Sequence, residues 1–289
     1  MRKINTIIFI CMSILLLAAC SATSSADEKT STLEKAKKSG KIVVGFAGEN
    51  PYAYEDENGK VTGESVEVAR AIFKKMGIEK MEGKLTKFSS LIPGLQAGKF
   101  DVITAGMYIT PERCKQVDFA EPDYSIGEAL AVRKGNPKNI HSYKDIANNP
   151  DIKVAVMNGA IEMDYLKAAG VKESQMEFVT DIPSNITSLE ANRVDAITMT
   201  GPTLTAALSS AKAKNIEVVE DFPQPIVDGK SIRGYGAAAF KSGDDEILKA
   251  YNEELKKMKE SGELLDTISK FGFTKSELPG DVTTKELCK

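Results

Sequence analysis

The chain of 289 residues contains no tryptophan and a single histidine, His141. Histidine-rich metal sites and Ser-His-Asp triads need an imidazole, and this chain could build either one only around that residue. The sequence also lacks a glycine-rich phosphate motif and a recognisable nucleophile-base pair. We therefore expect no enzymatic activity, no cofactor and no bound metal.

An excess of basic charge is absent as well. The chain has 38 Lys and Arg against 41 Asp and Glu, which gives a formal net charge of −3. No global positive field exists to attract nucleic acid or an anionic membrane surface, so we expect no nucleic-acid partner. The composition, 42% hydrophobic and 27% charged, is that of a globular protein and excludes collagen-like and disordered classes. The length suffices for one large or two medium lobes.

The first twenty residues have the pattern of an export signal. Arg2 and Lys3 form a short positive region, residues 4–17 are mostly apolar, and small residues precede Cys20. This order resembles a bacterial lipobox, in which the cysteine becomes the acylated first residue of the mature protein. We expect a signal peptide over 1–20 and a lipid anchor at Cys20, which tethers the protein to the extracytoplasmic face of the membrane. A cleaved signal with an incidental cysteine is the alternative.

Cysteine is scarce, with four in the chain. Cys11 would leave with the signal and Cys20 would be lipidated, so Cys114 and Cys288 remain. Neither lies in a C-x-x-C pair, so redox and zinc chemistry have no support from the sequence. A disulfide between Cys114 and Cys288 is the alternative to two free thiols, but we do not expect it.

After a polar tether and a first helix over 21–40, short apolar strands alternate with amphipathic helices, which predicts an α/β architecture. Residues 41–46 read as a strand, and a helix over about 90–97 leads into a strand at 100–105. Residues 153–157 start the same order again. The spacing of apolar residues predicts two further helices. The first ends at Gly77 and carries Val66, Ala69, Phe73 and Met76, which lie three or four residues apart. The second covers about 245–260 and carries one apolar stripe of Ile247, Leu248, Tyr251, Leu255 and Met258.

An internal repeat indicates two lobes of similar plan. Residues 92–106 align without gaps on residues 186–200, with six of fifteen positions identical. Chance similarity between two helix-turn-strand units is the alternative. The apolar stretches 128–133 and 235–240 flank the second copy, and we interpret them as paired crossover strands. The predicted domains are a first lobe over 41–133 and 235–273, a second lobe over 134–234, and a C-terminal tail over 274–289, with the ligand site in the cleft between the lobes.

Several motifs together resemble one family. Residues 45–54, 63–70, 91–101 and 109–113, with the lipobox, are similar to the polar amino-acid-type (family 3) solute-binding proteins of ABC importers. The resemblance covers about 41–273 and implies a two-lobe, periplasmic-binding-protein-like (type II) α/β fold. Such a protein delivers a small zwitterion to ABC permease subunits, and we expect it to act as a monomer. The segments most similar to ectoine/hydroxyectoine-binding members are 49–52, 89–94, 105–114, 126–129 and 134–137.

Arg113 lies in Thr110-Pro-Glu-Arg, where Thr is a good helix N-cap and Pro suits the first helical position. The resemblance implies that Arg113 grips the ligand carboxylate through a bidentate pair. In the second lobe, Ala160 and Ile161 precede a helix, and we expect their backbone N–H groups to contact the same carboxylate. Glu162 would lie beside them and orient Arg113, or would be a solvated residue at the helix start.

Three aromatic residues, Tyr52, Phe88 and Tyr108, follow separate predicted strands of the first lobe. The resemblance implies that they form an aromatic box around a diffuse cation, with about 0.5 to 2 kcal/mol from each ring. Core packing is the alternative for each ring taken alone. Glu49, in the first of these loops, would supply the counter-charge.

Thr200 departs from the pattern of the family. Amino-acid-binding relatives place an aspartate at the end of this strand, whereas residues 194–200 carry no acid at that end. A compact ammonium would lose its main partner, while an amidinium of spread charge can be held by rings and one carboxylate. The sequence therefore favours ectoine over standard amino acids. The alternatives are another polar amino acid or small zwitterion, a ligand sensor, and an enzyme built on the same scaffold with Glu49 or Glu162 as its acid or base.

Overall fold

In the computed structural model, which describes residues 30–227 and 230–289, the strand predicted at 41–46 is present as β1 (Lys41–Phe46). Its residues Ile42, Val44 and Phe46 are buried, as expected for a strand at the centre of a sheet. The first sheet has the order β4-β1-β5-β16-β6, and β1 pairs in parallel with β4 and β5. The other strands are β4 (Lys80–Leu85), β5 (Val102–Ile103), β6 (Asp118–Phe119) and β16 (Ala239–Phe240).

The helices of the first lobe follow the predicted apolar spacing. In α3 (Glu64–Lys75) Val66, Ala69 and Phe73 are buried, and the helix stops just before Gly77, whose φ of 83° suits glycine. The predicted C-terminal helix is α10 (Asp245–Ser261), with Ile247, Tyr251, Leu255 and Met258 buried. The remaining helices of this lobe are α2 (Thr32–Ser39), η1 (Phe88–Ser90), α4 (Leu91–Gln96), α5 (Pro111–Cys114), α11 (Glu263–Ile268) and η3 (Ser269–Phe271).

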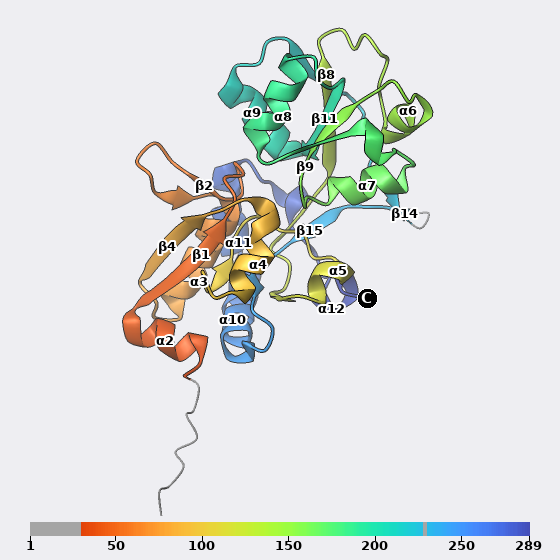
Figure 1. Cartoon of the computed structure of the whole chain (residues 1–289). Helices are drawn as coiled ribbons and strands as arrows, with labels where there is room; N and C mark the ends of the chain where they lie inside the picture. Colours follow the sequence, from red (N-terminus) through yellow and green to blue (C-terminus); the bar gives the residue numbers. More distant parts are fainter. Residues whose placement is uncertain (1–29, 228–229) are drawn as a thin grey trace, which may run out of the picture. The chain divides into compact units, whose positions relative to one another are not determined.

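The second sheet has the order β10-β9-β11-β8-β12, with β9 parallel to β10 and β11, and β8 antiparallel to β11 and β12. Its strands are β8 (Glu128–Arg133), β9 (Val154–Met157), β10 (Met176–Val179), β11 (Ala196–Thr200) and β12 (Ile216–Val218). Figure 1 shows α8 and α9 on one side of this sheet and α6 and α7 on the other. The helices are α6 (Tyr143–Asn148), α7 (Glu162–Ala168), η2 (Glu173–Gln175), α8 (Ile182–Glu190) and α9 (Gly201–Ala211).

The predicted crossover pairing is wrong. Residues 128–133 form β8, which lies inside the second sheet and pairs with β11 and β12 rather than with 235–240. The strands that do pair between the two sheets are β7 (Tyr124–Ile126) and β15 (Gly234–Gly236). The apolar run from Ala129 to Val132 fits a strand covered by helices on both faces, and apolarity alone does not say which sheet holds it. We therefore propose that the second lobe begins near residue 127.

The internal repeat corresponds to the same unit in each lobe. The first copy runs through α4 into β5, which is parallel to β1, and the second runs through α8 into β11, which is parallel to β9. Both strands therefore end at the carboxyl edge of a parallel sheet, where open α/β folds place their ligands. The prediction of a helix, a turn and a buried strand in both copies is confirmed.

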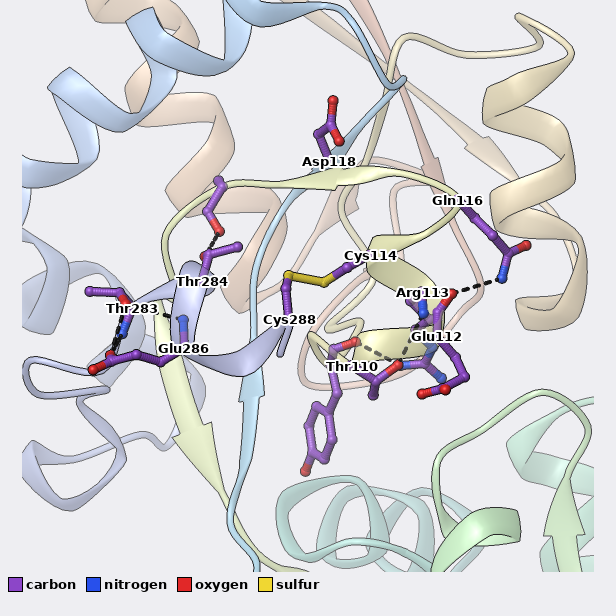
Figure 2. Close-up of a disulfide and its surroundings, with 12 residues drawn as sticks. Thr110, Glu112, Arg113, Cys114, Gln116, Asp118, Thr283, Thr284, Glu286 and Cys288 are labelled. Atoms are coloured by element: carbon purple, nitrogen blue, oxygen red, sulfur yellow. Dashed lines mark hydrogen bonds between the residues drawn. A yellow bond between two sulfur atoms is a disulfide. The ribbon is translucent and has the colours of Figure 1, made fainter.

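Cys114 and Cys288 form a disulfide, contrary to expectation. The bridge joins α5 to the last helix, α12 (Thr284–Leu287), across a sequence separation of 174 residues (Figure 2). The residues after 273 are therefore not a free tail. Thr284 donates from its backbone to Glu121 Oε2 at 3.0 Å and from its hydroxyl to the Ala120 carbonyl at 2.5 Å. A separation of 174 residues gave no sequence signal for this contact, because it depends on tertiary packing.

The smaller elements are β2 (Tyr54–Glu55), β3 (Val61–Thr62), β13 (Ile226–Val227), β14 (Lys230–Ser231) and η4 (Lys275–Glu277). Within residues 30–227 and 230–289 no helix combines the length and hydrophobicity needed to span a membrane. The same residues hold no cluster of three or more His, Cys, Asp and Glu side chains that could bind a metal ion. The predicted signal peptide and Cys20 lie outside the described residues.

Candidate functional site

Residues from the ends of four strands surround one cavity. The loops after β1 and β5 and helices η1 and α5 supply one wall, and the ends of β9 and β11 with the starts of α7 and α8 supply the other. Eight of the nine predicted binding residues line it, all except Tyr52; the lining residues are Glu49, Phe88, Gly106, Tyr108, Arg113, Met157, Ala160, Ile161, Glu162, Ile182, Thr198, Met199 and Thr200. The cavity is small, with a volume of about 30 Å³. We expect a ligand to enter when the two walls move apart and to be enclosed when they close.

Arg113 joins the two walls. The predicted cap is present: the Thr110 hydroxyl accepts from the Arg113 backbone N–H at 3.2 Å, and Pro111 is the first residue of α5. The guanidinium donates through Nη1 to the Tyr108 carbonyl at 2.9 Å and through Nη2 to the Gly159 carbonyl at 3.0 Å. Figure 2 shows Arg113 next to Cys114, which forms the disulfide with Cys288. Burial lowers the pKa of Arg113, and the nearby charges of Glu162, Asp164 and Glu49 oppose that shift, so the side chain stays cationic.

The loop after β9 brings Gly159, Ala160 and Ile161 to the cavity. The Ala160 N–H donates to the Met157 carbonyl at 3.1 Å, so this amide already has a partner within the turn. This contact weakens the expectation that Ala160 is an anion donor and leaves Ile161 as the better backbone candidate. Glu162 is the first residue of α7 and is only 5% exposed, which excludes the alternative of a solvated helix start.

The aromatic box is only partly present in this arrangement. Tyr52 does not line the cavity: its ring packs between Tyr124, with centroids 5.0 Å apart, and Phe273, at 5.6 Å. A Cβ at Gly106 would lie 2.5 Å from the Tyr52 ring, so this close packing requires glycine there. The Tyr52 hydroxyl donates to Thr200 Oγ1 at 3.1 Å. Tyr52 therefore acts on the cavity only through its hydrogen bond to Thr200, which lines it.

Phe88 and Tyr108 do reach the cavity. The Arg113 guanidinium carbon lies 5.5 Å from the centroid of the Phe88 ring, so this ring faces the protein's own cation. Tyr108 passes over β15, where a Cβ at Gly234 would lie 1.8 Å from its ring. Any side chain larger than that of Gly234 would therefore collide with the Tyr108 ring in its present position. The Tyr108 hydroxyl is buried and has no hydrogen-bond partner among the described residues.

Thr200 ends β11 without an acid, as the sequence shows, and its hydroxyl is engaged. It accepts from Tyr52 and donates to Thr203 Oγ1 at 3.0 Å. Across the sheet its register partner is Glu128 on β8. Directly opposite residues of an antiparallel pair lie on the same face, so the neighbouring strand places an acid next to Thr200, although Glu128 does not line the cavity.

Glu128 is a buried acid beside the site that the sequence analysis missed. It is 5% exposed, and both of its carboxyl oxygens are buried without a hydrogen-bond partner in the part of the chain that the structure describes. Its position in an apolar stretch was the available signal, because a carboxylate in a strand that is covered on both faces needs an explanation. Burial raises the pKa of Glu128 well above its usual value, and the charge of Glu162 raises it further.

Glu49 is the second carboxyl group that lines the cavity, with Glu162. Its Oε1 is buried with no hydrogen-bond partner in the described residues. Burial raises the pKa of Glu49 to about 8, helped by the charge of Glu162 and opposed by Arg113. Two carboxyl groups, those of Glu49 and Glu162, and the Arg113 guanidinium line the cavity, which suits a ligand with both a carboxylate and a cationic group.

Comparison with known proteins agrees with this geometry. Residues 42–274 match the family of bacterial extracellular solute-binding proteins, family 3. A probable amino-acid ABC transporter periplasmic-binding protein of Sinorhizobium fredii is 37% identical over 261 residues, which cover 89% of this chain and 86% of that protein. The L-cystine-binding protein of Escherichia coli is 30% identical over 255 residues, which cover 88% and 90%.

Solved structures share the fold. The crystal structure of EhuB in complex with hydroxyectoine has a TM-score of 0.82 and 35% identity, covering 89% of this chain and 98% of that one. The crystal structure of an ancestral amino acid-binding protein, a precursor of cyclohexadienyl dehydratase, has a TM-score of 0.72 and 31% identity, covering 83% and 99%.

The chain belongs to the family 3 extracellular solute-binding proteins and has their two-lobe type II periplasmic-binding-protein fold. It is an extracytoplasmic binding protein of the amino-acid type that serves an ABC transporter. Members of the family bind and hand over small solutes, and permease components are their partners. The expected α/β fold class and the expected family are confirmed.

Proposed function

We propose that this protein is a lipid-anchored, monomeric lipoprotein that closes around ectoine or hydroxyectoine and delivers it to ABC permease subunits. One observation carries the proposal: Arg113 and Glu49 line the same cavity, with the rings of Phe88 and Tyr108 beside them. Ectoine is a small cyclic zwitterion with a carboxylate and a ring amidinium. The guanidinium fits the carboxylate, and the carboxyl group with two rings fits a cation of spread charge.

Two further points support this ligand. The end of β11 lacks an acid at Thr200, which removes the partner that a compact ammonium uses in amino-acid-binding relatives. The structural neighbour EhuB, of 35% sequence identity, was solved with hydroxyectoine. Binding of about −8 kcal/mol, a micromolar dissociation constant, is within reach of a charge pair at each end and two aromatic faces.

A polar amino acid is the second candidate ligand, and the position of Glu128 opposite Thr200 favours it. This carboxyl group is the register partner of Thr200, so a compact ammonium could find an acid on the adjacent strand. A thermal-shift screen of ectoine, hydroxyectoine and polar amino acids at equal concentration separates the candidates, because a ligand stabilises the folded protein according to its affinity. Ectoine or hydroxyectoine should give the largest rise in melting temperature, and a larger rise with an amino acid would reject the proposed ligand.

The anchor and the lack of catalysis belong to the same proposal. The cavity presents carboxyl groups and one arginine but no nucleophile-base pair among its lining residues, and we expect the ligand to be released unchanged. A Cys20→Ala variant should leave the membrane fraction while keeping its ligand affinity, since a lipid chain is the expected attachment. Retention in the membrane pellet after a high-salt wash would count against the anchor.

A further inference from the structure

In the part of the chain that the structure describes, two side-chain hydrogen bonds cross the cleft between the lobes, away from the strands β7 and β15 that connect them. Arg113 makes one, from Nη2 to the Gly159 carbonyl at 3.0 Å. Tyr52 makes the other, from its hydroxyl to Thr200 Oγ1 at 3.1 Å. Tyr52 follows β1 in the first lobe and Thr200 ends β11 in the second. The Tyr52–Thr200 bond therefore exists only while the lobes are close together.

The first lobe holds the Tyr52 hydroxyl in a fixed position. The ring is buried, with the Tyr124 centroid at 5.0 Å and the Phe273 centroid at 5.6 Å, and it packs so closely on Gly106 that a Cβ there would lie 2.5 Å away. Burial raises the pKa of Tyr52 well above its usual value, so the hydroxyl keeps its proton and can donate at neutral pH. Because the ring is already immobile, forming the bond costs little side-chain entropy.

The second lobe holds Thr200 as the acceptor. Its backbone belongs to β11, and its hydroxyl donates to Oγ1 of the buried Thr203 at 3.0 Å. A threonine hydroxyl has one proton, and this bond uses it, so a lone pair of Thr200 Oγ1 is left for Tyr52. The three hydroxyl groups thus form a row in which each bond strengthens the next.

The two bonds across the cleft differ in their relation to the ligand. Arg113 lines the cavity, and a ligand carboxylate would take over its donors, so the bond to Gly159 would give way. Tyr52 does not line the cavity, and its bond to Thr200 lies beside the space that a ligand would fill. This bond can therefore remain when a ligand is enclosed.

We propose that the Tyr52 hydroxyl and Thr200 form a latch that holds the two lobes closed, both in part of the ligand-free molecules and around a bound ligand. The inference rests on the proposed function in taking ectoine as the enclosed ligand. The latch gives Thr200 a role that needs a hydroxyl and no charge. Tyr52 acts through Thr200 and is a positioning residue. Opening replaces the bond by bonds to water, so the latch should raise the ratio of closed to open molecules by roughly two- to tenfold.

The test measures the distance between two spin labels in the ligand-free protein by pulsed electron paramagnetic resonance. The labels are attached through Lys84→Cys on β4 and Ser209→Cys on α9, both at exposed positions, one in each lobe. Cys11→Ala and Cys20→Ala keep other thiols from taking the label. We expect a short distance from closed molecules and a longer one from open molecules, and their populations give the ratio.

Tyr52→Phe and Thr200→Val each remove one hydroxyl and keep the packed shape, so the protein should fold. Each should lower the ratio of closed to open molecules by roughly two- to tenfold, and the double variant should lower it no further. Thr200→Ser brings a hydroxyl back and should restore the ratio. A packing role for Tyr52 would predict no effect of Tyr52→Phe.

Tyr143→Phe is the matched control. The Tyr143 hydroxyl lies 2.6 Å from Thr198 Oγ1, so it is also a tyrosine–threonine pair on β11, but both residues belong to the second lobe. Thr198 also donates to the Ala129 carbonyl at 3.0 Å, which keeps it in place. This variant should leave the ratio of closed to open molecules unchanged.

Wild-type protein that shows only the open distance, or a ratio in Tyr52→Phe equal to that of the wild type, would overturn the latch. Calorimetric titration with ectoine should show weaker binding by Tyr52→Phe, by about the same factor as the ratio falls. Tighter binding would mean that the bond competes with the ligand, and would also overturn the latch. A shifted ratio in a protein whose wild type does not bind ectoine would reject the proposed ligand and keep the latch. An unchanged ratio in a protein that binds ectoine would do the reverse.

Discussion

The guanidinium Nη2 of Arg113 lies 3.0 Å from the carbonyl oxygen of Gly159, and this hydrogen bond joins one wall of the cleft to the other. The same guanidinium holds the Tyr108 carbonyl in its own lobe through Nη1. Arg113 therefore has donors directed at both walls of a cavity of about 30 Å³. A ligand carboxylate that enters the opened cleft can take over these donors, and closure then places it between the lobes.

Replacement of Arg113 by Ala should weaken ectoine binding by roughly 2 to 5 kcal/mol, because a buried ligand carboxylate loses its charged partner. Stability of the ligand-free protein should change little, since Arg113 is half-buried at the cleft. Calorimetric titration measures the affinity, and Lys115→Ala, an exposed cation after the same helix, serves as the control. An Arg113→Ala affinity within threefold of the wild type would reject this role.

Tyr108 tests the aromatic contribution. Tyr108→Leu keeps much of the apolar contact but removes the ring quadrupole, and should cost about 0.5 to 2 kcal/mol of ectoine binding. Tyr108→Phe keeps the ring and should cost less, although it also removes the hydroxyl beside Glu128. Because Tyr52 is packed against Tyr124 and Phe273, we expect Tyr52→Leu to lower stability as well as affinity. Equal ectoine affinities for Tyr108→Leu and Tyr108→Phe would contradict a cation-π contact.

Thr200 tests ligand selection by charge. Thr200→Asp should favour an α-amino acid over ectoine, since it restores a partner for a compact ammonium. It should also destabilise the protein, because the new carboxylate would face Glu128 across the sheet. Thr200→Asn, which has the same shape without the charge, is the control for the loss of the Thr200 hydrogen bonds. If Asp and Asn variants show the same ligand preference and stability, charge at this position does not select the ligand.

Glu49 predicts a pH dependence of binding. Burial raises the pKa of Glu49 to about 8, so the free protein holds its proton at pH 6, whereas a bound cation favours the ionised form. Binding then releases a proton, and ectoine affinity should rise between pH 6 and pH 8 by roughly tenfold or more before it levels off. Calorimetry at several pH values measures the rise, which Glu49→Gln should abolish. An affinity that falls over the same range would mean that the complex takes up protons instead.

The Cys114–Cys288 disulfide predicts a redox-sensitive stability. Because the bridge closes a long segment of chain, Cys288→Ser should lower the free energy of unfolding by about 2 to 5 kcal/mol. A reductant should lower the melting temperature of the wild type and leave that of Cys288→Ser unchanged. Lys289→Ala controls for a change at the chain end. Two reactive thiols at these positions in the native, oxidised protein would show that the bridge does not form.

The sequence predicted the elements that follow from local pattern. Apolar spacing located β1, α3 and α10, and the repeat located the strand ends where Tyr108 and Thr200 lie. Contacts between distant segments could not be predicted in this way. The pairing of 128–133 and the Cys114–Cys288 bridge were misjudged because strand partners and disulfides depend on the assembled fold. Glu128 was missed for the same reason, since only the cross-strand register brings it opposite Thr200.

The central claim is that the cleft selects a zwitterion whose cation has spread charge. Isothermal titration calorimetry of the purified protein with ectoine, hydroxyectoine, proline, glycine betaine, arginine, glutamine and L-cystine tests it most directly. We predict a dissociation constant of about micromolar order for ectoine or hydroxyectoine, and binding of every other compound that is weaker by about two orders of magnitude. Tighter binding of any of the amino acids than of ectoine and hydroxyectoine would contradict the claim.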